Sequence, residues 1–320
     1  MIKVENLKKA FGPKLAVNGI SFSVERGEVL GFLGPNGAGK STTMRMITGF
    51  IPPTEGRVTV GGNDITTDPI AAKRLIGYLP ENAPAYSDMT VRGFLNFSAQ
   101  IRGLSGRERN QAIDRVVELC FLNSVIHQSV DTLSKGYRHR TCFAQSIIHD
   151  PDILILDEPT DGLDPNQKHE VRSIIKRMGE KKAIIFSTHI LEEVEAVCSR
   201  AIIVDRGEIV ADGTPDELKK KSPNAGAVVL TVRGAESEGV KERLGQLGTV
   251  DTILILDDSD TITVKATPKS AGSQNELASN IADSANQAGW RIEELRTEEG
   301  KLDEVFRTIT KPDTAKEAAA

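Results

Sequence analysis

The clearest feature of the hydrophobic pattern is a set of short apolar runs separated by segments of helical periodicity. The runs are Ile153–Leu156, Ala183–Phe186 and Ala201–Val204. A strand that is buried on both faces of a parallel sheet has such an uninterrupted run. Because helical patterns lie between the runs, the sequence predicts an α/β core built on a mostly parallel sheet.

Two other patterns flank this core. Residues 2–8 and 20–26 alternate between apolar and polar side chains, and residues 55–62 form a third such segment. Alternation with period two is typical of half-buried strands, so we expect a small antiparallel β element. From Thr90 to Val125 the apolar spacing is near 3.6 residues. This spacing predicts a helical insertion, broken near Gly103, within a helical subdomain of about residues 88–145.

The pattern restarts after Gly226 and predicts a second domain. The expected strand, helix, strand, strand, helix and strand are Val228–Val232, Glu238–Leu247, Val250–Leu256, Thr261–Ala266, Gln274–Ala288 and Trp290–Arg296. This order is a ferredoxin-like plan. Residues 222–320 also carry an excess of Asp and Glu, whereas residues 1–221 are nearly balanced. We therefore predict a nucleotide-binding domain over 1–220, an accessory domain over 221–311 and a frayed tail over 312–320.

Composition narrows the class of protein. The chain has 320 residues, is 39% hydrophobic and carries a net charge of −5, so no basic field indicates a nucleic-acid partner. Three widely spaced cysteines predict neither disulfides nor a zinc site, and they suit a reducing cytoplasm. The N-terminus lacks a signal-peptide pattern, and no apolar run approaches the roughly 20 residues that span a bilayer. Work at a membrane would therefore require docking to another chain.

A glycine-rich segment after a short apolar strand carries the strongest chemical signal. It matches the phosphate-binding pattern G-x-x-x-x-G-K-[ST], and a helical pattern follows it, so phosphates would lie at a helix N-terminus. Lys40 would bind the β- and γ-phosphates, and the Ser41 hydroxyl would ligate Mg²⁺. The predicted nucleotide-binding residues of this loop are Gly34, Pro35, Asn36, Gly37, Ala38, Gly39, Lys40, Ser41 and Thr42.

Two acids follow the first apolar run directly. Asp157 would lie at the carboxyl end of a buried parallel strand, where ligands bind in open α/β sheets, and could hold Mg²⁺ beside the phosphates. Glu158, one residue later, could act as general base on the attacking water. A paired surface acid patch is the alternative interpretation, and the phosphate-binding loop argues against it.

Further segments resemble those of ABC ATPases and occur in the same order over residues 1–220. Leu133–Arg140 is similar to their signature segment, Asp161–Asp164 to their D-loop and Ser187–His189 to their H-loop. The resemblance implies a P-loop NTPase cassette that hydrolyses ATP with Mg²⁺. It also implies a head-to-tail dimer, in which each ATP contacts the Walker motifs of one copy and the signature of the other. In this family His189 would contact the γ-phosphate and act with Glu158. The other implied ATP contacts are Phe11, Glu81, Ser134, Lys135, Gly136 and Asp164.

The chain departs from the family pattern at two positions. Lys135 stands where the signature usually has glycine, and it would either add positive charge near the partner's phosphate or point to solvent. Glu81 stands where the Q-loop usually has glutamine, a residue that ligates Mg²⁺ and senses the membrane partner. A tolerated substitution with the same role is the favoured interpretation. The alternative hypothesis is that Glu81 makes hydrolysis more dependent on the partner chain.

The end of the cassette narrows the resemblance. Residues 202–218 and the segment Lys301–Phe306 are similar to ATPase subunits of ABC-2-type exporters, and the signature variant is most similar to the gliding-motility-associated branch. This implies a subunit on the inner face of the cell membrane, bound to a separate integral membrane permease. A non-transport ABC ATPase acting on ribosomes or DNA is the alternative. The accessory domain could also be regulatory or bind a small ligand, and its fold alone assigns no ligand.

Overall fold

The computed structural model describes residues 1–82, 84–269 and 274–310, and the chain divides into two compact units. The first unit is Met1–Pro215, and the second is Asp216–Ala320. The tail predicted to fray, residues 312–320, lies outside the described residues. Each unit has its own hydrophobic core and is described by itself.

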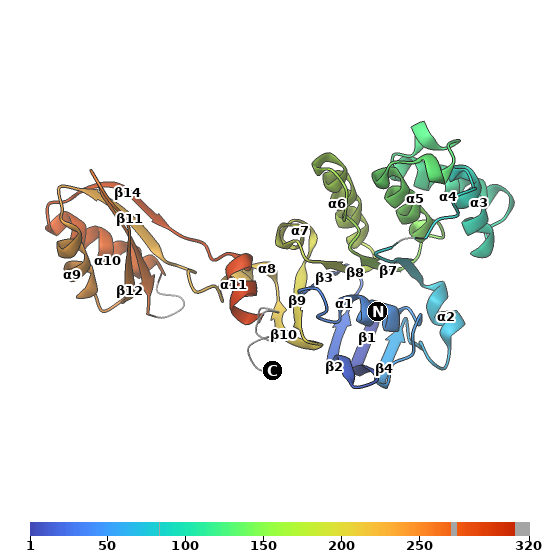
Figure 1. The fold of residues 1–320 in the computed structure, drawn as a ribbon, viewed down its shortest axis with the longest axis horizontal. Coiled ribbons are helices and arrows are strands. Elements are labelled where there is room, and N and C mark those ends of the chain that lie inside the picture. The colour runs from blue at the N-terminus through green and yellow to red at the C-terminus, as the bar shows by residue number, and fades with distance from the viewer. Residues whose placement is uncertain (83, 270–273, 311–320) are drawn as a thin grey trace. The chain divides into compact units, whose positions relative to one another are not determined.

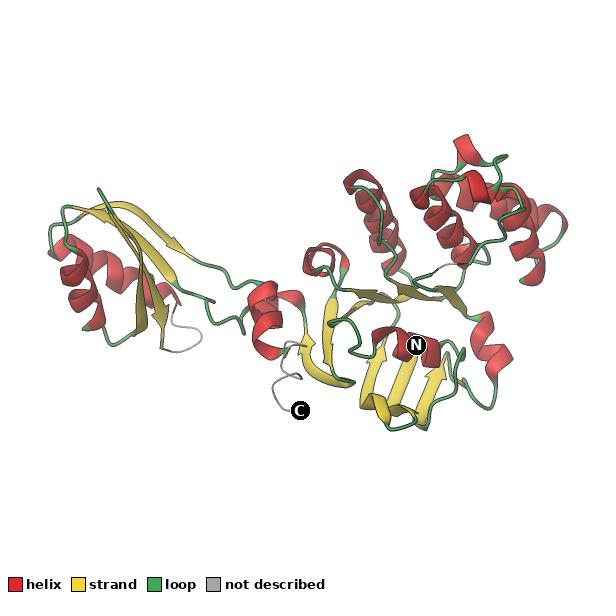
Figure 2. Cartoon of the chain, in the orientation of Figure 1, coloured by secondary structure: helices red, strands yellow, loops and turns green. Residues whose placement is uncertain are grey.

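A six-stranded sheet forms the centre of the first unit (Figure 2). Its order is β10-β9-β3-β8-β7-β6, and all neighbouring pairs are parallel except β10 with β9. The predicted apolar runs form three of its strands, and β7 and β8 are buried along their whole length. The parallel α/β core is thereby confirmed. The strands are β3 (Val29–Leu33), β6 (Ile76–Leu79), β7 (Ile153–Asp157), β8 (Ala183–Thr188), β9 (Arg200–Asp205) and β10 (Glu208–Gly213).

An antiparallel sheet of order β2-β1-β4-β5 lies below α1 in Figure 1. Helix α1 (Lys40–Ile47) contributes Met44, Met46 and Ile47 to one core that also contains side chains from both sheets. The helix is therefore held from two sides, which fixes the loop that precedes it. The strands of this sheet are β1 (Ile2–Phe11), β2 (Lys14–Val24), β4 (Glu55–Val60) and β5 (Asn63–Asp64).

Helices α3, α4 and α5 pack together as a helical subdomain (Figure 1). Thr90 caps α3 by accepting a hydrogen bond from the Gly93 N–H at 3.1 Å. The chain leaves α3 through Gly103, whose φ of +85° suits glycine, so the predicted break is present. The helices of this unit besides α1 are α2 (Pro69–Arg74), α3 (Val91–Ile101), α4 (Gly106–Leu119), α5 (Lys135–Ile147), α6 (Pro165–Gly179) and α7 (Leu191–Val197). Single 3₁₀ turns occur at Asn123–Val125 and Val130–Thr132.

The second unit is built on an antiparallel sheet of order β12-β13-β11-β14. Alternate residues of its strands, such as Leu230 and Val264, pack with α9 and α10 in one core. Between β11 and β14 the elements follow in the order β-α-β-β-α-β. The elements are α8 (Pro215–Lys219), β11 (Val228–Arg233), α9 (Ser237–Gly245), β12 (Val250–Asp258), β13 (Ile262–Pro268), α10 (Gln274–Gln287), β14 (Arg291–Thr297) and α11 (Leu302–Ile309).

Candidate functional site

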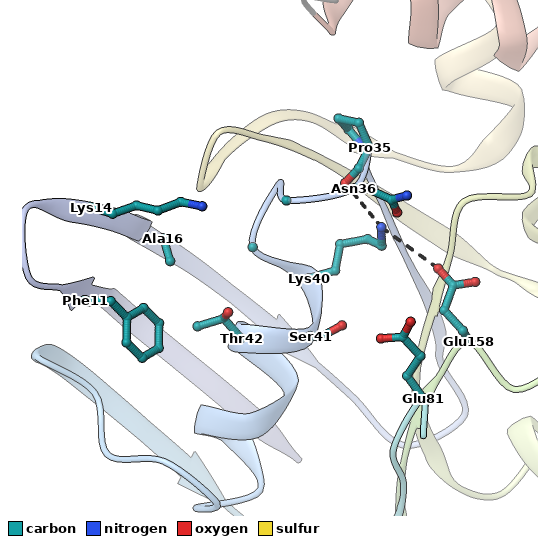
Figure 3. A pocket seen from close by; sticks show the side chains of 12 residues that line it. Phe11, Lys14, Ala16, Pro35, Asn36, Lys40, Ser41, Thr42, Glu81 and Glu158 are labelled. Atoms are coloured by element: carbon teal, nitrogen blue, oxygen red, sulfur yellow. Dashed lines mark hydrogen bonds and ion pairs between the residues drawn. The ribbon is translucent and has the colours of Figure 1, made fainter. Parts of the chain in front are cut away.

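A cavity opens over the loop between β3 and α1, at the carboxyl end of the parallel strands (Figure 3). The loop packs tightly against the rest of the unit. A Cβ on Gly39, whose φ is +106°, would come within 2.5 Å of the Ala16 carbonyl oxygen, and one on Gly34 within 2.4 Å of the Val204 carbonyl oxygen. These two positions therefore require glycine. The residues that line the cavity are Phe11, Lys14, Ala16, Pro35, Asn36, Gly37, Gly39, Lys40, Ser41, Thr42, Glu81 and Glu158.

The buried side chain of Lys40 reaches back over this loop. Its Nζ donates a hydrogen bond to the Gly34 carbonyl at 2.7 Å. Figure 3 shows the same Nζ beside the Pro35 carbonyl, at 3.4 Å, and a Glu158 carboxylate oxygen, at 3.9 Å. Burial lowers the pKa of Lys40, and the charges of Glu158, Asp157 and Glu81 oppose that shift. A cation surrounded by carboxylates and N–H groups of a helix N-terminus suits a polyanion such as a triphosphate.

Asp157 ends β7 and lies almost fully buried below the loop. One carboxylate oxygen, Oδ1, accepts hydrogen bonds from the Ser187 hydroxyl at 2.5 Å and the Ser41 hydroxyl at 3.3 Å. The other oxygen, Oδ2, is buried and has no hydrogen-bond partner among the described residues. An unpaired buried carboxylate oxygen is costly unless a cation binds it, so this atom fits a metal ligand.

The neighbouring groups suit a hard cation. The Ser41 hydroxyl and the Glu81 carboxylate face the same cavity, so the available ligand atoms are all oxygens, as Mg²⁺ prefers (Figure 3). Within the described part of the chain, no three His, Cys, Asp or Glu side chains form a metal cluster. Mg²⁺ needs no such cluster, because it commonly keeps waters and substrate phosphates as ligands.

Glu158 follows Asp157 with an unusual backbone conformation. Its φ is +50°, a left-handed value that costs a non-glycine residue free energy. His189, which follows β8, places its Nδ1 2.9 Å from the Glu158 Oε2 atom. Burial raises the pKa of the Glu158 carboxyl, and the bond from His189 and the charge of Lys40 oppose the rise. A buried carboxylate with a raised pKa that still borders the cavity is a suitable general base.

The aromatic ring of Phe11 closes the other end of the cavity. It is 52% exposed, and the Lys9 Nζ lies 5.2 Å from the centre of the ring. Lys14 and Ala16 line this end, and the sequence interpretation did not include them. Ala38, by contrast, is a buried residue of the loop that does not line the cavity, and its carbonyl accepts a hydrogen bond from the Gly207 N–H. Its position in the motif is the only signal that linked Ala38 to the nucleotide.

The signature residues do not line this cavity in the same chain. Ser134 caps α5 by accepting a hydrogen bond from the Tyr137 N–H, and Asp164 caps α6 by accepting one from the Gln167 N–H at 2.9 Å. Gly136 lies against the Gln167 side chain, where a Cβ would come within 2.2 Å of Oε1. The two capped helix starts therefore meet each other, away from the phosphate-binding loop.

The Lys135 side chain is 68% exposed, as the solvent alternative expected, and it also makes a contact within the chain that neither alternative described. Its Nζ forms an ion pair with Asp161 of the D-loop at 3.0 Å, within the same chain. The Lys135 side chain also lies over Gly162, whose φ is +67°. In this structure Lys135 therefore links the start of α5 to the segment before α6.

Comparisons with known proteins agree with this geometry. A family model described as "ABC transporter" matches residues 17–161. The linearmycin resistance ATP-binding protein LnrL of Bacillus subtilis (strain 168) is 33% identical over 311 residues, which cover 97% of this chain and 98% of that protein. The probable multidrug ABC transporter ATP-binding protein YbhF of Escherichia coli (strain K12) is 40% identical over 70% of this chain, and the match covers 39% of YbhF.

Solved structures give the same fold. An ATP-binding subunit of an ABC transporter superposes with a TM-score of 0.65 at 28% identity, over 69% of this chain and 92% of that one. The dimeric cassette MJ0796 superposes with a TM-score of 0.63 at 23% identity, over 67% of this chain and 98% of that one. Among the described residues, no helix is long and apolar enough to cross a membrane.

Proposed function

The chain belongs to the ABC transporter family and is an ATPase of that family, and from this premise we propose that it energises an ABC-2-type exporter. The names of the relatives, linearmycin resistance and multidrug transport, support export. These names do not favour the alternative of a non-transport ATPase acting on ribosomes or DNA. The observation that carries the ATPase part of the proposal is the convergence of Lys40, Asp157 and Glu158 at one phosphate-binding loop.

The proposed roles follow from this geometry. Lys40 and the N–H groups of the loop bind the phosphates, and Phe11 stacks on adenine. Ser41, Asp157 and Glu81 would hold Mg²⁺, which would neutralise charge on the phosphate oxygens. Asp157 is the strongest candidate ligand, because its Oδ2 atom has no other partner among the described residues.

Glu158 would then act on water. A water oxygen attacks the γ-phosphorus, its proton passes to the Glu158 carboxylate, and the bond to the bridging oxygen of ADP breaks. His189 contacts Glu158 at 2.9 Å and would keep this carboxylate aimed at the water. The protein contributes mainly positioning and charge, which is the usual basis of phosphoryl transfer.

The position of the signature segment supports a dimer. Ser134, Lys135, Gly136 and Asp164 do not line the cavity of their own chain, and in a dimer they would instead complete the site of a second copy. A head-to-tail pair of cassettes, residues 1–220, would bind two ATP molecules between them. The pair would work at the inner face of the membrane on a separate integral membrane permease. Residues 221–311 would form a ferredoxin-like accessory domain on each copy.

Co-purification tests this proposal. The tagged chain is recovered from detergent-solubilised membranes of its own host, and the tag alone is the control. We expect an integral membrane protein to be recovered with the chain and to raise its ATP hydrolysis rate. Recovery of ribosomes or DNA instead, with no membrane protein, would favour the non-transport alternative.

A further inference from the structure

The buried hydroxyl of Ser187 lies between the two acids at the end of β7. Ser187 and Asp157 are register partners in the parallel ladder of β7 and β8, so their side chains point to the same face of the sheet. Ser187 is fully buried, and no part of it lines the nucleotide cavity. Any effect of Ser187 on the nucleotide site must therefore pass through its neighbours.

The donor and the acceptor in each hydrogen bond of the Ser187 hydroxyl can be assigned. A serine hydroxyl has one proton, and Ser187 donates it to the Asp157 Oδ1 atom at 2.5 Å. Its oxygen accepts a hydrogen bond from the Glu158 N–H at 3.0 Å, and the Ser187 carbonyl accepts from the same N–H at 3.2 Å. One residue thus contacts the side chain of Asp157 and the backbone of Glu158.

Both contacts affect how the two acids are oriented. The bond to Oδ1 stops the Asp157 carboxylate from rotating and leaves Oδ2, which has no partner among the described residues, as the free oxygen. The bonds to the Glu158 N–H hold a peptide whose φ of +50° is unfavourable for glutamate. Without the Ser187 hydroxyl, the bond to Oδ1 that remains among the described residues is the one from Ser41 at 3.3 Å.

We propose that Ser187 is a positioning residue that orients Asp157 toward Mg²⁺ and holds Glu158 in place for catalysis. Groups that hydrogen-bond to a metal ligand set its direction, and their loss commonly weakens metal binding or activity by about 10- to 100-fold. The inference rests on the proposed Mg²⁺ role of Asp157. It is independent of the transported substrate and of the permease.

The test compares Ser187→Ala with Ser146→Ala in the full-length protein. Ser146 is equally buried, and its hydroxyl donates a hydrogen bond to the Phe143 carbonyl within α5 at 2.7 Å, so the control removes the same group away from the site. Metal affinity is measured without turnover, by electron paramagnetic resonance titration of Mn²⁺ into each protein saturated with a non-hydrolysable ATP analogue. The kcat, the KM for ATP and the Mg²⁺ concentration for half-maximal rate are measured in parallel.

We expect Ser187→Ala to weaken Mn²⁺ binding and lower kcat by about 10-fold or more, with a much smaller change in the KM for ATP. Ser146→Ala should stay within about two-fold of the wild type in all of these quantities. Ser187→Thr keeps the donor and should recover most of the Mn²⁺ affinity.

Two results with the variants would overturn the inference. One is a folded Ser187→Ala protein with the Mn²⁺ affinity and kcat of the wild type. The other is an equal loss in Ser146→Ala, since any buried hydroxyl would then have the same effect. If the wild type itself hydrolyses ATP without a divalent cation, the proposed Mg²⁺ role of Asp157 fails, and the inference falls with it.

Discussion

At the scale of single residues, the site depends on how burial and neighbouring charges set the state of a few groups. Glu158 is nearly buried, and burial raises the pKa of its carboxyl, while His189 and Lys40 favour the carboxylate. Because these effects oppose each other, the Glu158 carboxylate can serve as a proton acceptor beside Lys40, which would bind the phosphates. If Glu158 is the base, a site without it would still bind ATP but would not hydrolyse it, which would separate binding from catalysis.

Glu158→Gln is the direct test of this separation. The amide keeps the size of the side chain but cannot accept the proton of water, so we expect the rate of phosphate release to fall by about 10²- to 10⁴-fold. ATP binding should persist, and ATP should shift the variant toward a dimer in size-exclusion chromatography. Glu238→Gln, at an exposed position of α9, is the control and should behave as the wild type. Undiminished hydrolysis by Glu158→Gln would remove Glu158 from the role of base.

At the scale of elements, α5 joins the signature segment to the buried core. Its first turn carries Ser134 and the Lys135–Asp161 ion pair, and one turn later His139 is buried with neither ring nitrogen hydrogen-bonded among the described residues. Burial lowers the pKa of His139 from 6.5 to about 4, the charge of Asp161 opposes this shift and that of Lys135 adds to it. The helix therefore holds a neutral histidine that the unfolded chain would protonate first.

This difference predicts an acid-sensitive stability. The folded-state pKa of His139 is lowered, so its contribution is fully present above pH 6.5 and is lost as the pH falls toward 4. As the pH falls from 6.5 to 4, the unfolding free energy of the wild type should fall by about 2–3 kcal/mol more than that of His139→Leu. Urea unfolding followed by far-ultraviolet circular dichroism at several pH values measures the difference. Comparing the proteins at pH 7.5 isolates the packing effect, and parallel stability curves below pH 6.5 would contradict the prediction.

One strand of the central sheet could not be predicted from the hydrophobic pattern of the sequence. The strand β6 was not predicted, because Ile76-Gly77-Tyr78-Leu79 is short and contains glycine, which is unfavourable in strands. In the fold, a Cβ on Gly77 would come within 2.3 Å of the Ser146 carbonyl oxygen. The glycine is required by the close approach of α5, a long-range contact that no local pattern encodes.

At the scale of the whole molecule, the chain consists of two units with separate cores. The similarity to LnrL extends over 97% of the chain and therefore includes both units. The single tryptophan, Trp290, packs against the core of the second unit, whereas every residue that lines the nucleotide cavity belongs to the first. Tryptophan fluorescence and nucleotide binding therefore report on different units.

This arrangement predicts two separable unfolding transitions. ATP with Mg²⁺ at 100 times its dissociation constant should stabilise the first unit by about 2.7 kcal/mol, because a ligand favours only the unit that binds it. The transition followed by Trp290 fluorescence should stay where it is. Differential scanning calorimetry and fluorescence-detected urea unfolding of the Glu158→Gln protein, which keeps ATP intact, measure both. A shift of the Trp290 transition by the same free energy would show that the units unfold as one.

The sequence by itself determined the chemical groups and the α/β core. A phosphate-binding loop is a local arrangement of glycines, lysine and serine between a strand and a helix, so its pattern is visible in nine consecutive residues. Apolar runs likewise identify strands buried on both faces of a sheet, because burial there leaves no polar position. These signals need no knowledge of distant contacts.

The tertiary structure decided how those groups are oriented. Ser187 meets Asp157 only because β7 and β8 pair in one register, 30 residues apart along the chain. Lys135 pairs with Asp161 across the space between α5 and the D-loop, an outcome that its position in the signature did not indicate. Hydrogen bonds and ion pairs act over a few ångströms, so their partners are set by the folded arrangement and not by the order of residues.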